Sequence, residues 1–368
     1  MKVLVTGSKG FVGKNLCAVL RHREDVELLE YDIDNSLQDL DSALEKADCI
    51  IHLAGVNRPK NMDEFETGNA GSLDTICTRL ETMGRAPKIV LSSSIQADLE
   101  NPYGLSKRHA ELRLKAYAEK TGAACVVYRL KNLFGKWCRP NYNSVTATFC
   151  HNIARGLPIQ VSDPAYEFEL TYIDDVVKMF VGELAEGATG FRFGSALSAR
   201  KITLGELADK IRCYRDVRQT LRLPNFESAF DRALYATYLS YLEEEDFGYA
   251  LDVKSDERGS LAEFIKSPAL GQIFVSHTKP GITRGHHFHH TKTEKFLVVK
   301  GTAVIRFRHI ERDEVIEYEV RGEEYRVLDI PPGYTHSIEN VGVEDLVTLF
   351  WTSEMFDPGK PDTYFDRV

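Results

Sequence analysis

Apolar residues along this 368-residue chain follow two different patterns. In the first part, short apolar runs alternate with longer segments in which apolar residues recur at spacings of three and four. The runs that predict strands are 2–7, 26–31, 49–55, 88–94 and 125–130. Because strands that alternate with amphipathic helices form a parallel sheet covered on both faces, this part predicts an α/β, Rossmann-type doubly wound sheet.

The pattern changes after about residue 245, where the acidic run 243–246 ends the helical part. Short stretches rich in β-branched residues follow, separated by Gly and Pro, among them 272–278, 294–301 and 346–352. Such stretches are typical of an all-β sandwich or small barrel. We therefore predict two domains, 1–245 and 246–368.

Composition narrows the classes of partner. The net charge is −9 and no stretch clusters Lys and Arg, which disfavours nucleic acid and anionic membrane surfaces. No run of about 18 apolar residues, long enough to span a bilayer, is present. The seven cysteines form no CxxC pair, so we expect free thiols in a reducing cytoplasm. All seven precede residue 214, so a metal site later in the chain would need His and carboxylate ligands.

A glycine-rich turn joins the first predicted strand to the first predicted helix. Its residues Gly7, Gly10, Phe11, Val12 and Gly13 predict a dinucleotide site, in which the backbone approaches a pyrophosphate held at the helix N-terminus.

The second predicted strand ends in two acidic residues, Glu30 and Asp32, and either one is placed to contact the cofactor ribose; we include Asp32 in the predicted cofactor set. No arginine stands beside them in the sequence, which argues against a 2′-phosphate and for NAD(H).

A second constellation combines Tyr103, Lys107 and the serines that end the strand 88–94. Tyr103 and Lys107 are four residues apart and share one face of a predicted helix. A lysine ammonium there would lower the pKa of the phenol, so that tyrosine exchanges a proton with a carbonyl or alcohol oxygen. A strand-end serine would hold the same oxygen, and the short segment before Tyr103 leaves Ser93 and Ser94 both open.

With these motifs, residues 1 to about 240 resemble the extended short-chain dehydrogenase/reductase family, which acts on nucleotide sugars. Further matching residues are His52, Leu53, Ala54, Gly55, Asn69, Asn132, Gly135, Asp174 and Asp175. The resemblance implies that Ser94, Tyr103 and Lys107 are catalytic, that Leu53, Ala54 and Gly55 contact the cofactor, and that Asn132 lies near the substrate diphosphate.

The second part carries a histidine cluster. The spacing of Gly281, His287, His289, Glu294 and Gly301 is similar to the first cupin motif, and 331–340, which contains His336, is similar to the second. Tyr325 departs from the second motif, which usually begins with Gly.

On a strand, residues 287 and 289 would face the same way, and Glu294 and His336 would complete a three-nitrogen, one-oxygen metal site. Such a set suits Zn, Fe, Mn or Ni; the alternative is a metal-free cupin whose histidines are acid/base or core groups. The segments 256–263 and 284–287 are also similar to dTDP-4-dehydrorhamnose 3,5-epimerases.

A reductase fused to a cupin resembles a bifunctional family of capsular polysaccharide biosynthesis, and 52–59, 132–150 and 354–365 carry the likeness. The resemblance implies that the cupin domain epimerises C3 of a UDP-2-acetamido-2,6-dideoxy-hexos-4-ulose and that the first domain reduces its C4 ketone. The product would be UDP-2-acetamido-2,6-dideoxy-L-talose, on the route to UDP-N-acetyl-L-fucosamine. The resemblance also implies NADP(H), zinc and a homodimer. The choice between NADPH and NADH stays open, because the acidic residues at the end of the second predicted strand favour NADH.

The chemistry orders the two steps, because the C3 proton is acidic only while the C4 carbonyl is present. His290, Lys295 and Tyr334 are equal candidates for the C3 base. Two other functions stay open: a single-function reductase whose cupin only stabilises a dimer, and a non-enzymatic ligand sensor. The intact Tyr103 and Lys107 argue against a sensor.

Overall fold

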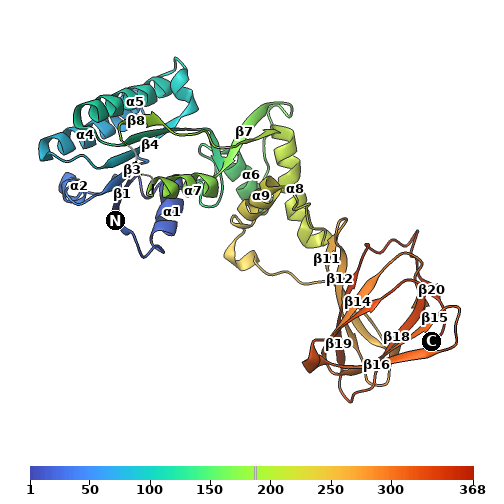
Figure 1. Ribbon diagram of the computed structural model, residues 1–368. Helices are drawn as coiled ribbons and strands as arrows, with labels where there is room; N and C mark the ends of the chain where they lie inside the picture. Colours follow the sequence, from blue (N-terminus) through green and yellow to red (C-terminus); the bar gives the residue numbers. More distant parts are fainter. Residues whose placement is uncertain (186, 188) are drawn as a thin grey trace. The chain divides into compact units, whose positions relative to one another are not determined.

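The computed structural model describes residues 1–185, 187 and 189–368. It contains two compact units, Met1–Ile211 with Arg232–Leu242, and Arg212–Asp231 with Glu243–Val368 (Figure 1). The sequence-based division at residue 245 stays a prediction. Among the described residues, no helix is both long enough and apolar enough to cross a membrane.

The first unit is built on a parallel six-stranded sheet in the order β2-β1-β3-β4-β5-β8. All six strands run parallel, and the order in which the chain adds them reverses between β1 and β3, which is the point where doubly wound sheets bind their ligands. The five predicted strands are confirmed. The sheet consists of β1 (Lys2–Thr6), β2 (Glu27–Tyr31), β3 (Cys49–His52), β4 (Lys88–Ser94), β5 (Cys125–Leu130) and β8 (Phe191–Phe193).

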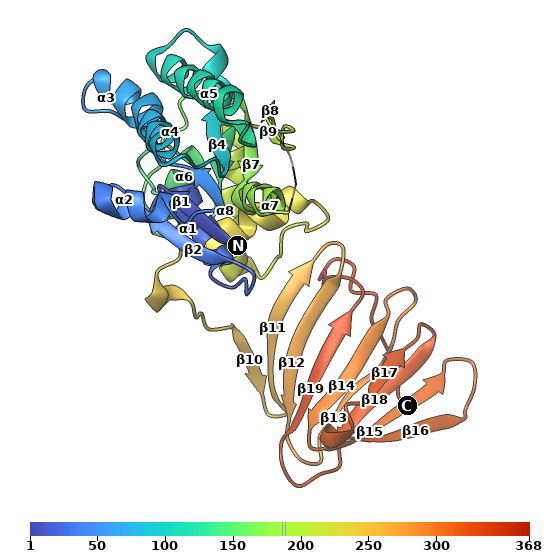
Figure 2. The ribbon, with the colours of Figure 1, turned by 60° about the vertical axis from the view of Figure 1, so that its left-hand side comes forward.

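Helices cover both faces of this sheet (Figure 2). Alternate strand residues divide between the faces: Leu4 packs toward α2, α4 and α5, whereas Val3 packs toward α1 and α7. The helices on the two faces are α1 (Phe11–Leu20) and α7 (Ile173–Glu183) on one, and α2 (Leu37–Leu44), α4 (Ser72–Met83) and α5 (Pro102–Thr121) on the other. The remaining helices are α3 (Asp63–Phe65), α6 (Val145–Ala154), α8 (Leu204–Thr220) and α9 (Ala229–Leu239).

Smaller elements complete the list. Glu66–Gly71 is a π-helical turn, and Ile95–Asp98, Glu244–Asp246 and Gly322–Glu324 are 3₁₀ turns. A second, small sheet contains β6 (Asn132–Phe134), β7 (Glu167–Tyr172) and β9 (Arg200–Thr203).

The second unit holds two antiparallel sheets, in the orders β10-β11-β12-β19-β14-β17 and β16-β15-β18-β13-β20. Phe296, Ile305, Ile338 and Phe350 form its core. This arrangement confirms the predicted jelly-roll, although β10, β11 and β20 were not among the predicted strands. The strands are β10 (Val253–Asp256), β11 (Gly259–Ser267), β12 (Gly271–Thr278), β13 (Thr283–Phe288), β14 (Glu294–Lys300), β15 (Thr302–His309), β16 (Val315–Arg321), β17 (Val327–Ile330), β18 (Tyr334–Asn340), β19 (Leu346–Thr352) and β20 (Tyr364–Phe365).

Tyr325, the residue that departs from the cupin motif, lies just before β17 in the left-handed region, with φ of 48°. Its side chain is 73% exposed. The backbone there keeps the conformation that glycine adopts most easily, so the departure changes the residue and not the turn.

Candidate functional site

The glycine turn between β1 and α1 leaves no room for side chains. Gly7 has φ of +70°, and a Cβ on it would lie 2.7 Å from the backbone nitrogen of Ala54. A Cβ on Gly13 would lie 2.1 Å from the carbonyl oxygen of Gly7. Gly10 caps α1 without a side-chain hydrogen bond, so the amide groups of the first turn are available to a phosphate.

A cavity of about 260 Å³ opens beside this turn, and it gathers most of the predicted cofactor and catalytic residues. Ala54 backs the turn, and Asp32, at the end of β2, accepts a hydrogen bond from the Lys9 amide at 2.7 Å. The lining residues from the prediction are Gly7, Gly10, Phe11, Val12, Gly13, Leu53, Gly55, Ser94, Tyr103 and Lys107.

Tyr103 and Lys107 lie in the first turns of α5, where Asn101 caps the helix by accepting the Gly104 amide at 2.7 Å. The helix starts close against the 3₁₀ turn Ile95–Asp98 that follows β4, since a Cβ on Gly104 would lie 2.1 Å from the carbonyl oxygen of Gln96. This close contact accommodates the short segment before Tyr103.

The structure distinguishes the two candidate serines. The hydroxyl of Ser93 donates to the buried carboxylate of Glu111, which Arg129 also binds. The hydroxyl of Ser94 instead accepts the Gln96 amide at 3.2 Å and lies near enough to Tyr103 to lower the pKa of its phenol. Ser94 is therefore the serine that lies with the tyrosine.

The electrostatics of this pair differ from the sequence-based expectation. Burial raises the pKa of Tyr103, and only its interaction with Ser94 opposes that rise. Burial also lowers the pKa of Lys107 to about 8, against the opposing charge of Glu111. In the chain by itself, burial outweighs any lowering of the phenol pKa by Lys107, whose nitrogen lies 5.8 Å from the centre of the tyrosine ring.

At the end of β2, Arg21 binds both carboxylate oxygens of Glu30, at 2.7 and 2.8 Å. Lys9 pairs with Asp34. No arginine stands beside the acidic residues in the sequence, but Arg21 reaches Glu30 from the end of α1, which weakens the argument against a 2′-phosphate. Lys9, Lys14, Arg21 and Glu30 all border a larger cavity of about 850 Å³.

Asn132, predicted near the substrate, is exposed at the start of β6. Its neighbours Lys131 and Leu133 line the cavity, together with Asn57, and none of these three was predicted. Lys131 also lines an adjoining cavity of about 310 Å³ that reaches Thr171 and Phe193. The alternation of side chains along a strand could have identified Lys131 and Leu133, since residues 131 and 133 face the opposite side from residue 132.

The four predicted metal ligands of the second unit come together. One ligand atom each from His287, His289, Glu294 and His336 lies within 4.8 Å of all the others. The Nε2 atoms of His289 and His336 are each 3.4 Å from Glu294 and make no hydrogen bond with the described residues. Buried, converging nitrogen atoms without hydrogen-bond partners fit a bound metal ion.

The protonation states agree with metal binding. Burial lowers the pKa of His287 to about 4, so its imidazole is neutral at pH 7. Burial alone would raise the pKa of Glu294, but His289 and His336 bring it well below its usual range. A neutral imidazole and an ionised carboxylate are the forms that bind metals.

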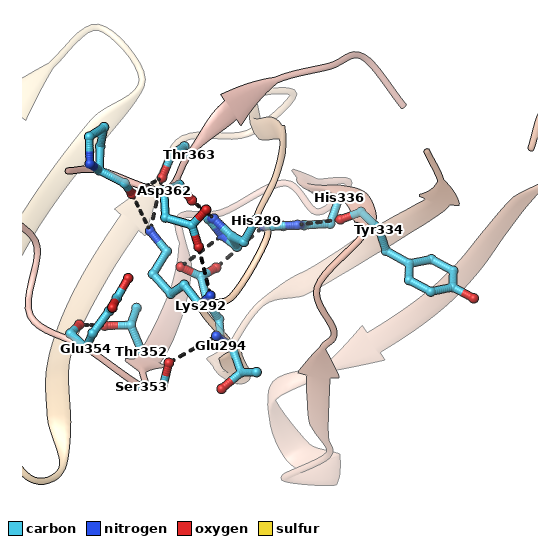
Figure 3. A network of polar contacts seen from close by, with 12 residues as sticks. His289, Lys292, Glu294, Tyr334, His336, Thr352, Ser353, Glu354, Asp362 and Thr363 are labelled. Atoms are coloured by element: carbon cyan, nitrogen blue, oxygen red, sulfur yellow. Dashed lines mark hydrogen bonds and ion pairs between the residues drawn. The ribbon is translucent and has the colours of Figure 1, made fainter. Parts of the chain in front are cut away.

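His289 does not lie on the same strand as His287, contrary to the sequence-based expectation. β13 ends at Phe288, a bulge follows Gly285, and His289 lies in the next turn. Its Nδ1 contacts the backbone oxygen of Asp362 at 2.6 Å (Figure 3). The ligand is therefore positioned by the C-terminal segment, a contact that the strand period does not predict.

A cavity of about 270 Å³ adjoins these ligands, and none of the three candidate C3 bases lines it. His290 packs against Tyr364, Lys295 is exposed and pairs with Asp329, and the Tyr334 ring points away from the ligand cluster (Figure 3). The residues that line the cavity are Lys254, Leu261, Glu263, Gln272, Phe274, His287, Lys292, Glu294, Thr352, Glu354, Phe356 and Thr363.

Known proteins match both units. Residues 3–193 match the NAD dependent epimerase/dehydratase family, and residues 254–364 match the Polysaccharide biosynthesis C-terminal domain. The crystal structure of the capsular polysaccharide assembling protein CapF from Staphylococcus aureus is 50% identical, covers 100% of both chains and superposes with a TM-score of 0.93. The chain belongs to the CapF family.

A second relative matches over almost the whole chain. UDP-2-acetamido-2,6-beta-L-arabino-hexul-4-ose reductase from Pseudomonas aeruginosa is 44% identical over 99% of this chain and 98% of its own length. UDP-glucuronic acid 4-epimerase from Bacillus cereus, 16% identical with a TM-score of 0.54 over 66% of this chain and 98% of its own, shares the fold. The expected resemblance is confirmed, and the chain is an oxidoreductase with a nicotinamide cofactor.

Proposed function

We propose that the chain performs two consecutive steps on a UDP-2-acetamido-2,6-dideoxy-hexos-4-ulose: C3 epimerisation in the second unit, then NADPH-dependent reduction of the C4 ketone in the first. The product is UDP-2-acetamido-2,6-dideoxy-L-talose, on the route to UDP-N-acetyl-L-fucosamine. The observation that carries the reduction is the placement of Ser94, Tyr103 and Lys107 around one cavity with the glycine turn. The name of the Pseudomonas relative supports a UDP-linked 4-keto sugar as substrate.

The reduction assigns a role to each of these three side chains. A bound nicotinamide would supply the hydride to C4. Tyr103, which burial keeps protonated at neutral pH, donates its proton to the C4 oxygen, and Ser94 donates a hydrogen bond to the same oxygen. The positive charge of Lys107 stabilises the tyrosinate that remains.

Two cations favour NADPH over NADH. Arg21 and Lys9 lie at the end of β2, where an adenosine ribose contacts a doubly wound sheet. A 2′-phosphate there would compete with Glu30 for Arg21 and with Asp34 for Lys9, gaining two charge-assisted contacts.

The second unit supplies the epimerase. His287, His289, Glu294 and His336 would hold zinc, which would supply positive charge at the cavity wall. The cavity beside them, which His287 and Glu294 line, accepts the sugar ring. Epimerisation precedes reduction because reduction removes the carbonyl that makes C3 acidic. The implied homodimer also stays a proposal.

Incubation of the 4-keto sugar nucleotide in deuterated water tests both steps. Without NADPH, we expect one deuterium at C3 by mass spectrometry, retained in Tyr103→Phe and lost in His287→Ala. With NADPH, the wild type reduces the deuterated ketone, and Tyr103→Phe binds NADPH but does not oxidise it. Reduction without deuterium uptake would leave a single-function reductase.

A further inference from the structure

Lys292 is a buried lysine in the turn between β13 and β14. The residue is 9% exposed. Its ammonium donates hydrogen bonds to the backbone oxygen of Pro361 at 3.2 Å and to the hydroxyl of Thr363 at 3.0 Å (Figure 3). Both acceptors are neutral, and no carboxylate among the described residues forms an ion pair with it.

Two other buried lysines show how the charge of a buried ammonium is balanced in this chain. Lys88 is also largely buried, and its ammonium lies 2.7 Å from the carboxylate of Glu183, which balances its charge. Lys107 is 7% exposed and, like Lys292, forms no ion pair within the described chain; it lines the reductase cavity. A buried ammonium without a carboxylate is unfavourable in the free protein, so its position is explained by a negatively charged ligand.

The ammonium of Lys292 reaches the wall of the cavity of about 270 Å³ in the second unit. Lys292 and Thr363 both line it, and the hydrogen bond between them places the ammonium at that wall. An ammonium has three donors, and two are used by Pro361 and Thr363. The third donor remains for a molecule in the cavity, which His287 and Glu294 also line.

We propose that Lys292 is a catalytic residue of the epimerase and donates a hydrogen bond to the C4 oxygen of the substrate as negative charge develops there. The inference rests on the proposed C3 epimerisation. The C3–H bond breaks, its proton passes to a base, and its electron pair forms the C3–C4 double bond while the carbonyl electrons move to the C4 oxygen. Reprotonation of C3 from the opposite face restores the ketone, with no net redox change.

Lys292 acts here as a fixed charge that keeps its proton throughout. A donor that meets charge only in the transition state raises kcat, whereas a contact made equally in the bound ground state lowers KM. The substrate diphosphate is already charged before the reaction. A lysine that binds the diphosphate would therefore change KM, and one that binds the enolate oxygen changes kcat.

The test measures C3 deuterium exchange without NADPH in the full-length chain. Lys292→Met removes the charge, Lys292→Arg keeps it, and Lys295→Met is the matched control, because Lys295 lies three residues away outside the cavity and pairs with Asp329. We expect Lys292→Met to lower kcat for exchange about 100-fold or more with KM nearly unchanged. Lys295→Met keeps the wild-type rate, and Lys292→Arg exchanges faster than Lys292→Met.

Zinc content, melting temperature and NADPH-dependent reduction of the already epimerised ketone are measured in parallel. We expect all three to stay at wild-type values in Lys292→Met. Loss of zinc, a change confined to KM, or an equal loss of exchange in the Arg variant would overturn the assignment to Lys292. Absence of exchange in the wild type would instead remove the proposed epimerase itself.

Discussion

The Nδ1 atom of His289 lies 2.6 Å from the backbone oxygen of Asp362, a residue 73 positions further along the chain. Nδ1 therefore carries the proton and donates it, which leaves the Nε2 lone pair directed at Glu294. The Asp362 carboxylate in turn accepts the amides of His290, Thr291 and Lys292, at 3.0, 2.9 and 2.8 Å. The C-terminal segment thus fixes both the tautomer of a metal ligand and the turn that carries it.

Replacement of Asp362 tests this relationship. In Asp362→Ala the three amides lose their acceptor and the turn that bears His289 becomes mobile, so we expect zinc affinity to fall about 10- to 100-fold. Competition with a chromophoric chelator measures it. Asp357→Ala is the control, because Asp357 accepts the Gly359 amide in the same segment and does not contact the turn. Equal zinc affinity in both variants would contradict the role given to Asp362.

The neighbouring serines of β4 should separate catalysis from stability. Ser94→Ala removes a hydrogen bond to the reacting oxygen, so we expect kcat for reduction to fall about 100-fold with little loss of stability. Ser93→Ala leaves the buried carboxylate of Glu111 short of one donor, so we expect a loss of about 1–3 kcal/mol in unfolding free energy. Steady-state kinetics and urea unfolding of both variants provide the comparison, and a reversed pattern would assign the catalytic role to Ser93.

The proposed preference for NADPH places the 2′-phosphate of the coenzyme against Arg21. In Arg21→Ala the 2′-phosphate loses a charge-assisted contact, so we expect the KM for NADPH to rise about tenfold while the KM for NADH changes little. Glu30→Gln is the matched change on the partner side and frees Arg21 from its bidentate ion pair. It should keep or lower the KM for NADPH. Equal effects of Arg21→Ala on both coenzymes would mean that Arg21 does not contact the 2′-phosphate.

Features set by local periodicity were predictable from the sequence. Parallel strands buried on both faces produce continuous apolar runs, which located β1 to β5. The glycine turn was recognisable from its position between a predicted strand and a predicted helix. The grouping of His287, His289, Glu294 and His336 followed from their spacing and its likeness to the two cupin motifs. Contacts made by tertiary folding were not predictable: Arg21 reaches Glu30 from another element, Asp362 reaches His289 across the unit, and the missing counter-ion of Lys292 is visible only in three dimensions.

His52 makes the stability of the first unit depend on pH. Burial, and secondarily the charge of Lys107, lower the pKa of His52 from 6.5 to about 3, and Thr6 holds its Nδ1 at 2.7 Å. Between these two values the unfolded chain binds a proton that the folded chain does not, so stability falls as the pH falls. From pH 7 to pH 5 we expect His52 to account for a loss of about 2 kcal/mol.

Urea unfolding of wild type and His52→Asn at the two pH values isolates this contribution. The Asn variant cannot titrate, so its unfolding free energy should depend less on pH by that amount, whatever its stability at pH 7. The fluorescence of Trp137, in a Trp351→Phe background, reports the first unit, since the chain has two tryptophans. An unchanged pH dependence would show that His52 does not carry the effect.

The left-handed conformation of Tyr325 predicts a stabilising substitution. A non-glycine residue at φ of 48° is strained, and the exposed tyrosine ring gives up little packing when removed, so we expect Tyr325→Gly to stabilise the second unit by about 1 kcal/mol. Trp351 fluorescence in a Trp137→Phe background follows its unfolding in urea. Val327→Gly, two residues later in β17, is the control. It should destabilise the second unit by about 1 kcal/mol, because glycine in a strand loses more conformational freedom on folding than valine does. Destabilisation by both changes would mean that the tyrosine makes compensating contacts in this turn.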